Sequence, residues 1–242
     1  MPDRIFSDPR LAAIYDEIDS DRRDLDHYEA ILDRLGAHSV LDIGCGTGVL
    51  GCRLSAQGLT VIGVDPAQAS LDVARRKPGA DVVTWLLGEA ATLPPLMVDA
   101  VTMTGNVAQV FVDDEEWSVV LNAAHAALGD GGHLVFETRD PSYRAWEEWT
   151  RERSISVTDT VAGRVEHWVE VTEVALPLVS FCHSYRFIDA GDLVTSDSTL
   201  RFRDRDEITA ALGANGFTIE EVSDAPDRPG REFAFISRPT PT

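Results

Sequence analysis

The chain is poor in the residues on which several covalent chemistries depend. Its 242 residues include one lysine, Lys77, which lacks the G-x-x-x-x-G-K-[ST] context of a P-loop, so P-loop and Schiff-base lysine chemistry are both disfavoured. The three cysteines, Cys45, Cys52 and Cys182, form no C-x-x-C pair, and their odd number favours reduced thiols. The sequence therefore implies neither a metal site nor a disulfide.

Positive charge and long apolar runs are also scarce. Against 41 acidic residues there are 21 lysines and arginines, and the net charge of −20 would repel a nucleic-acid backbone. The basic runs at 22–23 and 75–77 lie on predicted helices among acids and are interpreted as solvated faces. No apolar run approaches the ~18 residues of a membrane helix, and the acidic N-terminal segment does not resemble a signal peptide, so we expect a cytoplasmic protein.

What is present is an ordinary globular composition. With 44% hydrophobic and 26% charged residues, the chain predicts one folded domain over residues 1–242. Two helices are expected within residues 1–36, the second with Ser20 and Asp21 as N-cap candidates and its end at Gly36. Short apolar runs then alternate with helix-length segments, which is typical of βαβ units. Five parallel strands are predicted at 40–43, 60–64, 82–87, 98–103 and 133–137, with a helix at 114–128.

The pattern changes after Pro141. Alternating segments at 164–175, 179–189 and 193–203, separated by turn signals, predict an antiparallel insertion within residues 151–203. A helix at 206–215 and strands at 217–222 and 232–237 complete the chain. The sequence thus predicts an α/β fold, a doubly wound, mostly parallel Rossmann-like sheet with an antiparallel β insertion after the fifth strand.

The strongest functional signal follows the first strand. A buried run ends in Asp42 and continues into Gly44, Gly46 and Gly48 before a helix. Glycine tolerates positive φ and lets a ligand approach the backbone, and a helix N-terminus offers N–H groups to a carboxylate. Because Asp42 supplies the opposite charge, a ligand with both an amino and a carboxylate group fits, whereas a pyrophosphate would meet an unfavourable carboxylate.

This segment resembles the first motif of class I S-adenosylmethionine-dependent methyltransferases, an acid followed by G-x-G-x-G, and the resemblance extends over about residues 37–140. It implies S-adenosylmethionine as cofactor, with the loop from Asp42 through Cys45 to Gly48 around its methionine part. The acid after the second strand, Asp65, is implied to bind the ribose hydroxyls, with Pro66 beside the adenine.

The same resemblance implies further cofactor contacts after the third and fourth strands. Glu89 and Ala90 occupy the place of a small or acidic pair near the adenine, where aspartate is commoner than glutamate. Thr104, Gly105 and Asn106 occupy the stretch that passes beneath the cofactor.

Residues 46–51 also satisfy the dinucleotide fingerprint G-x-G-x-x-G, with Asp65 at about the expected ~20 residues beyond it. A nicotinamide oxidoreductase is therefore one alternative, and glycines that only make a tight strand-to-helix turn are another. Asp42 and Gly44 ahead of the hexapeptide, together with the ordered recurrence of the later motifs, favour the methyltransferase.

Two further residues have two interpretations each. Tyr15 resembles a tyrosine that covers the cofactor in some members of the family, or it is an aromatic that packs its helix. Arg139 follows the fifth strand, where ligands bind α/β sheets, and either holds an anionic group of the acceptor or pairs with Glu137 or Asp140.

The predicted insertion places titratable groups in apolar rows. Alternation puts His167 on one face of its strand with three valines, and His183 and Tyr185 on one face of the next strand with Val179 and two phenylalanines. If these rows face the crevice, His167, His183 or Tyr185 would orient the acceptor or remove its proton, because histidine titrates near neutral pH. Otherwise the rows pack on the main sheet or on a second subunit.

We therefore expect an enzyme, a methyltransferase that acts on a small-molecule acceptor. In-line displacement from a sulfonium needs mainly alignment and water exclusion, so no universal catalytic residue is expected. The alternatives from other classes are a noncatalytic S-adenosylmethionine-binding protein and an NAD(P)-dependent oxidoreductase. Neither nucleic acid nor membrane is expected as a partner, and a homodimer is left open.

Overall fold

The computed structural model describes residues 1–226 and 228–241, which form two sheets. The larger sheet has seven strands in the order β10-β11-β5-β4-β1-β2-β3. These strands are β1 (Ser39–Ile43), β2 (Thr60–Asp65), β3 (Thr84–Leu87), β4 (Val98–Met103), β5 (Leu128–Arg139), β10 (Phe217–Asp224) and β11 (Glu232–Pro239). The first five pair in parallel, whereas β11 runs antiparallel to β5 and to β10.

Helices cover both faces of this sheet because its strands are apolar on both sides. Val40 and its neighbours pack against α3 (Asp24–Arg34) and α4 (Val49–Ala56) on one face. Leu41 and its neighbours pack against α6 (Asp114–Ala127) and α8 (Arg205–Ala214) on the other. A capping box between Asp204 and Glu207 fixes the start of α8.

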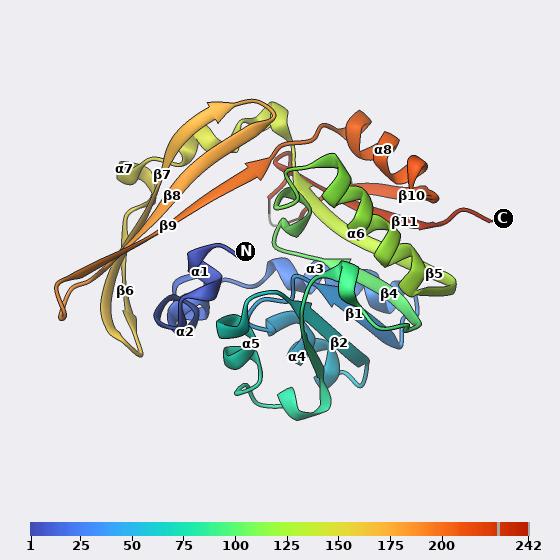
Figure 1. Ribbon diagram of the computed structural model, residues 1–242, viewed down its shortest axis with the longest axis horizontal. Coiled ribbons are helices and arrows are strands. Elements are labelled where there is room, and N and C mark those ends of the chain that lie inside the picture. The colour runs from blue at the N-terminus through green and yellow to red at the C-terminus, as the bar shows by residue number, and fades with distance from the viewer. Residues whose placement is uncertain (227, 242) are drawn as a thin grey trace.

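Shorter helices fill the connections. They are α1 (Arg4–Ser7), α2 (Pro9–Ile18), α5 (Gln68–Ala74), α7 (Arg151–Ser154), and the 3₁₀ turns η1 (Ala80–Val82), η2 (Ala90–Thr92), η3 (Val107–Gln109), η4 (Pro141–Tyr143) and η5 (Ala145–Glu148). Figure 1 shows α1 and α2 between the two sheets, next to the N-terminus.

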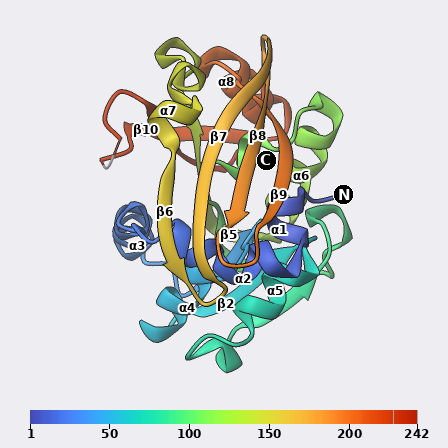
Figure 2. The ribbon, with the colours of Figure 1, turned by 90° about the vertical axis from the view of Figure 1, so that its left-hand side faces the viewer.

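The smaller sheet is antiparallel, with β6 (Ser156–Thr160), β7 (Gly163–Ala175), β8 (Leu178–Phe187) and β9 (Asp192–Arg201) in that order. One face packs on α1 and α2, where Val165, Tyr185 and Phe187 contact Leu11 and Ile14. Figure 2 shows this sheet in front of the two helices. The antiparallel sheet is thereby held against the edge of the parallel sheet by the N-terminal segment.

The predicted fold class is confirmed, with differences in some elements. The third strand begins at Thr84 and not at residue 82, because residues 80–82 form a 3₁₀ turn whose Ala80 carbonyl accepts from the Trp85 indole at 3.0 Å. The helix expected after Ser20 or Asp21 begins at Asp24. Strand β6 was not predicted, because its side chains are largely exposed and its sequence lacks apolar alternation.

Candidate functional site

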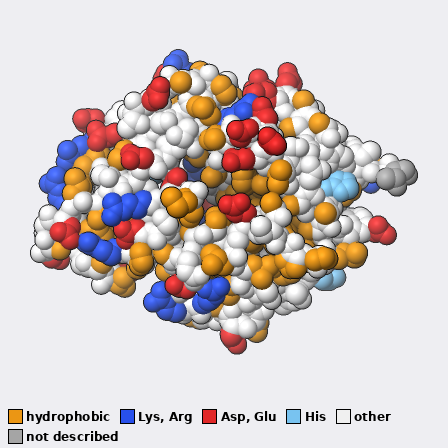
Figure 3. Space-filling model, viewed as in Figure 1, with side chains coloured by type: hydrophobic (Ala, Val, Ile, Leu, Met, Phe, Trp, Pro, Cys, Tyr) orange, Lys and Arg blue, Asp and Glu red, His pale blue; other side chains and the backbone are white. Residues whose placement is uncertain are grey.

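A cavity of about 720 Å³ lies at the carboxyl ends of the parallel strands. The loops after β1, β2, β3 and β4 form one wall, and Phe6, Tyr15 and the β9 residues 197–199 form another. The first turn of α6 contributes Glu115 and Glu116. Figure 3 looks onto this hollow, where apolar and acidic side chains gather between the two sheets. This is the edge at which open α/β sheets bind ligands.

The glycine-rich loop forms the floor of the cavity through its backbone. Gly44, Gly46 and Gly48 all have positive φ, from 54° to 77°. A Cβ on Gly44 would come within 2.7 Å of Val107, and one on Gly48 would clash with the Trp85 ring, so these two glycines are required for packing. A Cβ on Gly46 would meet no atom within 4 Å. Gly46 therefore leaves open space at the cavity wall, where a ligand can approach the backbone.

Two buried carboxylates stand at the ends of β1 and β2. Asp42 accepts a hydrogen bond from Thr102 Oγ1 at 2.8 Å, and burial, opposed by this bond, raises the pKa of Asp42 to about 7. Asp65 accepts from the backbone N–H groups of Gly46 at 2.9 Å and Ala67 at 2.7 Å. Burial raises the pKa of Asp65 as well, against the opposing effect of these two bonds. Burial disfavours the ionised form of both carboxylates. A ligand that brings a positive charge or hydrogen-bond donors would stabilise that ionised form.

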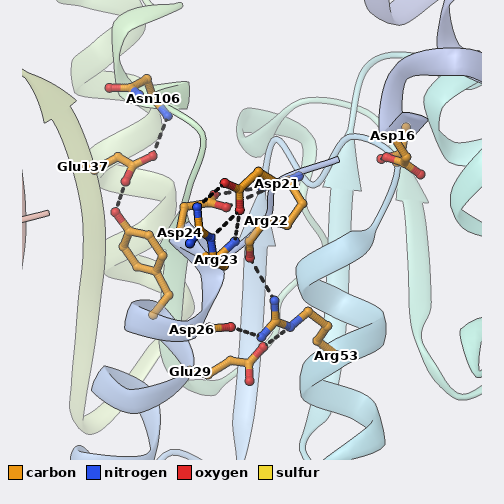
Figure 4. Close-up of polar contacts among 12 residues, drawn as sticks. Asp16, Asp21, Arg22, Arg23, Asp24, Asp26, Glu29, Arg53, Asn106 and Glu137 are labelled. Carbon is orange, nitrogen blue, oxygen red and sulfur yellow. Dashed lines mark hydrogen bonds and ion pairs between the residues drawn. The ribbon is translucent and has the colours of Figure 1, made fainter. Parts of the chain in front are cut away.

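The cavity wall is acidic overall. It includes the carboxylates of Asp3, Asp42, Asp65, Glu89, Glu115, Glu116 and Asp197, and one cationic side chain, that of Arg22. The Arg22 guanidinium is held by Asp24 at 3.1 Å, and Figure 4 shows both side chains at the start of α3. A ligand with two positive centres and one carboxylate matches this arrangement. S-adenosylmethionine has a sulfonium, an ammonium and one carboxylate, so the residues present fit it.

The N-terminal helices close the cavity through polar contacts with the parallel sheet. Asp16, next to Tyr15, accepts from Thr47 Oγ1 of the glycine loop at 2.5 Å and forms an ion pair with Lys77. Burial, reinforced by the charge of Asp19, raises the pKa of Tyr15 to about 12, so the phenol is neutral at physiological pH. Lys77 lies just after α5 and Arg22 just before α3, so the interpretation of the two basic runs as solvated helical faces is wrong for these two residues.

Most of the cofactor residues implied by the resemblance line the cavity. Those that line it are Tyr15, Asp42, Gly44, Cys45, Gly46, Asp65, Pro66, Glu89, Ala90, Thr104 and Gly105. Gly48 and Asn106 are not among the lining residues. Gly48 instead caps α4 and packs on Trp85, and Asn106 is buried with 3% of its surface exposed. The cofactor-binding roles of all thirteen residues remain predictions.

Asn106 belongs to a buried polar network under the cavity. Its backbone N–H donates to Glu137 at 3.0 Å and its side-chain amide to Glu232 at 3.2 Å. Glu137 also accepts a hydrogen bond from the Tyr28 hydroxyl, and Figure 4 shows Glu137 turned toward Asn106. Burial, reinforced by the charge of Glu232, raises the pKa of Glu137 to about 7. The network fastens α3 to the carboxyl ends of β4 and β5 and fixes the loop that follows β4.

Arg139 has different partners from those considered in the sequence. Its Nη1 donates to Gln109 Oε1 at 2.9 Å, and its Nε lies 3.5 Å from Glu232 Oε1, a residue on β11. Neither Glu137 nor Asp140 is its ion-pair partner among the described residues, because β11 pairs with β5 and brings Glu232 opposite Arg139.

His167, His183 and Tyr185 form a row of stacked rings across β7 and β8. The ring centroid of His167 lies 5.2 Å from that of Tyr185 and 5.8 Å from that of His183. Tyr185 packs on the N-terminal helices, and none of the three lines the large cavity. Burial, with the nearby His167, lowers the pKa of His183 to about 4. Tyr185 thus meets α1 and α2, which the sequence alternatives of crevice, main sheet and second subunit did not include, and the catalytic role of all three residues stays a prediction.

Sequence reasoning missed several cavity residues. Arg22 carries no motif, and its place between two helices is the only hint of a special role. Residues 110–112 precede α6, whose first turn is acidic. Acidic residues are common at the start of a helix, so the sequence contains no sign that this segment lines a cavity. The β9 residues 197–199 reach the cavity only because the antiparallel sheet folds back over it.

The fold and the cavity define a doubly wound α/β protein with a ligand crevice at the glycine-rich edge. Residues 40–132 match a family model described as a methyltransferase domain. Among curated relatives, the cypemycin N-terminal methyltransferase of Streptomyces sp. is 32% identical over 159 residues, which cover 61% of this chain and 65% of that protein. The chain spans about half the length of the curated relatives that it matches.

Solved structures share the fold over nearly the whole chain. The CcbJ methyltransferase from Streptomyces caelestis has a TM-score of 0.78 at 20% identity, with 96% of each chain covered. The amino pentose methyltransferase CalS10 from Micromonospora echinaspora, solved with S-adenosylmethionine bound, has a TM-score of 0.68 at 23% identity, with 90% of this chain and 93% of that chain covered. The chain is thus similar to methyltransferases over residues 40–132 and shares the fold of solved methyltransferases over nearly its whole length.

Proposed function

We propose that the protein transfers a methyl group from S-adenosylmethionine to a small-molecule acceptor held between the parallel sheet and the antiparallel sheet. The observation that carries this proposal is the cavity of about 720 Å³, which combines the glycine-rich floor with an acidic wall. Its size lies within the range of small-molecule sites, roughly 300–1,000 Å³. The methyltransferase relatives and the amino pentose methyltransferase among the structural neighbours support a small acceptor.

The cofactor residues divide by position along the sheet edge. Asp42 would bind the ammonium of the methionine part, and Arg22 its carboxylate. Asp65 would accept hydrogen bonds from the ribose hydroxyls. Glu89 and Ala90, at the end of β3, would lie beside the adenine. The same assignment keeps Thr104 and Gly105 under the methionine part, since both follow β4 at the cavity wall.

S-adenosylmethionine supplies an electrophilic methyl whose sulfur leaving group is already activated. The protein therefore contributes mainly alignment and exclusion of water. Phe6 and Tyr15, whose rings lie 5.7 Å apart, cover the cavity from the N-terminal side. The polar contacts of Asp16 with Thr47 and Lys77 hold this cover in place. The β9 residues 197–199 and residues 110–112 line the remaining space, where the acceptor would bind.

Calorimetric titration and a turnover screen test the proposal. We expect S-adenosylmethionine and S-adenosylhomocysteine to bind, with no measurable heat for NAD or NADP. Release of S-adenosylhomocysteine across a panel of amines, phenols, carboxylic acids and amino sugars then identifies the acceptor. Comparable dinucleotide binding would favour an oxidoreductase, and cofactor binding without turnover of any acceptor would favour a noncatalytic binding protein.

Other expectations from the sequence concern the surroundings of the protein. Among residues 1–226 and 228–241, no helix is both long and apolar enough to cross a membrane. The cytoplasmic location, the absence of a nucleic-acid partner and the homodimer remain predictions, as does the organisation of the chain as one domain.

A further inference from the structure

A second cavity, of about 270 Å³, lies at the end of β5 and has a wall unlike that of the first. It is enclosed by β5, the segment after it, and the connection between β10 and β11. The residues that matter here are Arg139, Arg228, Arg231, Glu148, Glu232 and Trp149. Three guanidinium groups thus face two carboxylates in a chain whose net charge is −20.

The arginines present unused hydrogen-bond donors. Each guanidinium carries five N–H donors. Among the described residues, Arg139 uses one of them in a hydrogen bond, to Gln109 at 2.9 Å. Arg231 likewise has one hydrogen bond, a long one of 3.4 Å to Glu148, and its guanidinium carbon lies 4.7 Å from the Tyr143 ring centroid. The two guanidinium groups are oriented by aromatic and polar contacts yet keep donors for a further partner.

The carboxylates of this cavity are shared among several cations. Glu232, with 3% of its side chain exposed, lies 2.9 Å from Arg228 Nη1 and 3.5 Å from Arg139 Nε. Glu148 lies 3.4 Å from Arg231 and 3.6 Å from Arg153, which approaches from outside the cavity. Arg139 and Arg231 keep guanidinium donors that these two carboxylates do not take up. An oxyanion is the group that guanidinium forks bind best, through paired and charge-assisted hydrogen bonds.

Residues around the smaller cavity contact the antiparallel sheet and the loop that follows β4. Gln109, the partner of Arg139, ends η3, which begins at Val107 in the wall of the large cavity. Trp149 lies with its ring centroid 5.5 Å from the Arg139 guanidinium and 4.8 Å from Phe181 of β8. A molecule bound at Arg139 would therefore lie between the antiparallel sheet and the loop that follows β4.

We propose that this smaller cavity binds an oxyanion of the methyl acceptor, a carboxylate or a phosphate, through Arg139 and Arg231, so that the acceptor is an anionic small molecule. This inference rests on the proposed function for the acceptor, but the anion site itself does not need it. The large cavity, rich in carboxylates, receives the cationic cofactor, and the arginine-rich cavity receives the negative end of the acceptor.

Binding of the anion can be measured without cofactor or acceptor. In ¹⁵N-labelled full-length protein, the indole N–H resonance of Trp149 would be followed during titration with inorganic phosphate and, separately, with succinate at constant ionic strength. We expect a saturable shift with at least one of them, and the tighter ligand distinguishes phosphate from carboxylate. Arg231→Gln should weaken this binding roughly tenfold. Arg238→Gln is the matched control, because Arg238 is 49% exposed against 48% for Arg231 and pairs with Glu220 elsewhere.

The site would be overturned if neither anion gave a saturable shift, or if Arg231→Gln left the affinity for the anion unchanged. Its link to the acceptor is tested by turnover. Anionic acceptors should react and their uncharged esters should not, and Arg231→Gln should raise KM at least about tenfold while the affinity for S-adenosylhomocysteine stays unchanged. Equal use of the esters would overturn the assignment. Loss of S-adenosylhomocysteine binding in the unmodified protein would instead refute the proposed function, which keeps the two failures distinct.

Discussion

The two sides of the large cavity are built in different ways. On the parallel sheet, the wall consists mainly of backbone, with Gly44, Gly46 and Gly105 at positive φ and the acids Asp42 and Asp65 at strand ends. On the antiparallel sheet, the wall consists of side chains of β9 and of the helices that the sheet covers. A backbone-built wall requires particular residue types at fixed spacing. A side-chain wall accepts many sequences, so it can vary with the acceptor.

The sharpest test of the backbone-built side compares two glycines of the same loop. Gly48→Ala should lower the free energy of unfolding by about 3 kcal/mol, because it adds left-handed strain and a clash with Trp85. Gly46→Ala should cost only about 1 kcal/mol, because its Cβ meets no atom within 4 Å, yet it should weaken cofactor binding. Urea unfolding and calorimetry measure both. Equal destabilisation by the two changes would contradict the division between packing and ligand glycines.

The next effect concerns the acid at the end of β2. Asp65→Ala should weaken S-adenosylhomocysteine binding by roughly tenfold or more, because hydrogen bonds to a charged group contribute about 1.5–3 kcal/mol each. Asp72→Ala is the control, since Asp72 lies on α5 with 51% of its side chain exposed and pairs with Arg75. An unchanged dissociation constant in a folded Asp65→Ala protein would move the ribose contact elsewhere.

The pH dependence of cofactor binding should come from the parallel side alone. Burial raises the pKa of Asp42 to about 7, so at pH 6 this carboxyl is mostly protonated and cannot attract an ammonium. Affinity for S-adenosylhomocysteine should therefore rise roughly tenfold from pH 6 to pH 8, as Asp42 ionises. His183, with its pKa lowered to about 4, stays neutral over this range and contributes nothing. Asp42→Asn should abolish the dependence, and a dependence that survives this change would assign it to another group.

The smallest effects are expected on the antiparallel side. His167→Gln, His183→Gln and Tyr185→Phe should each leave cofactor affinity and turnover within about twofold, because these side chains line neither cavity. Initial rates with the acceptor found in the turnover screen, beside calorimetry, measure this. Loss of turnover with intact cofactor binding in any of the three would restore that residue as a catalytic candidate.

Local sequence patterns predict most of the parallel half of the molecule. Strands β1, β2 and β4 begin and end within one residue of their predicted bounds, because buried parallel strands are continuous apolar runs between turn signals. The glycines at 44, 46 and 48 also indicated the tight turn between β1 and α4, since few other residue types tolerate the positive φ of these positions. Alternation also predicts that His183 and Tyr185 share a face of β8, and their rings stack in the structure, whereas the register of β7 with β8 was not predicted.

The partners of those faces and charges depend on long-range packing, which local patterns do not show. Tyr185 packs on α1 and α2, more than 140 residues away in sequence, and no local pattern encodes that contact. Arg139 pairs with Glu232 because β11 returns antiparallel beside β5, so its neighbours in sequence are not its partners. Apolar periodicity fixes which side of an element is buried, whereas the specific partner depends on long-range packing of elements that are distant along the chain.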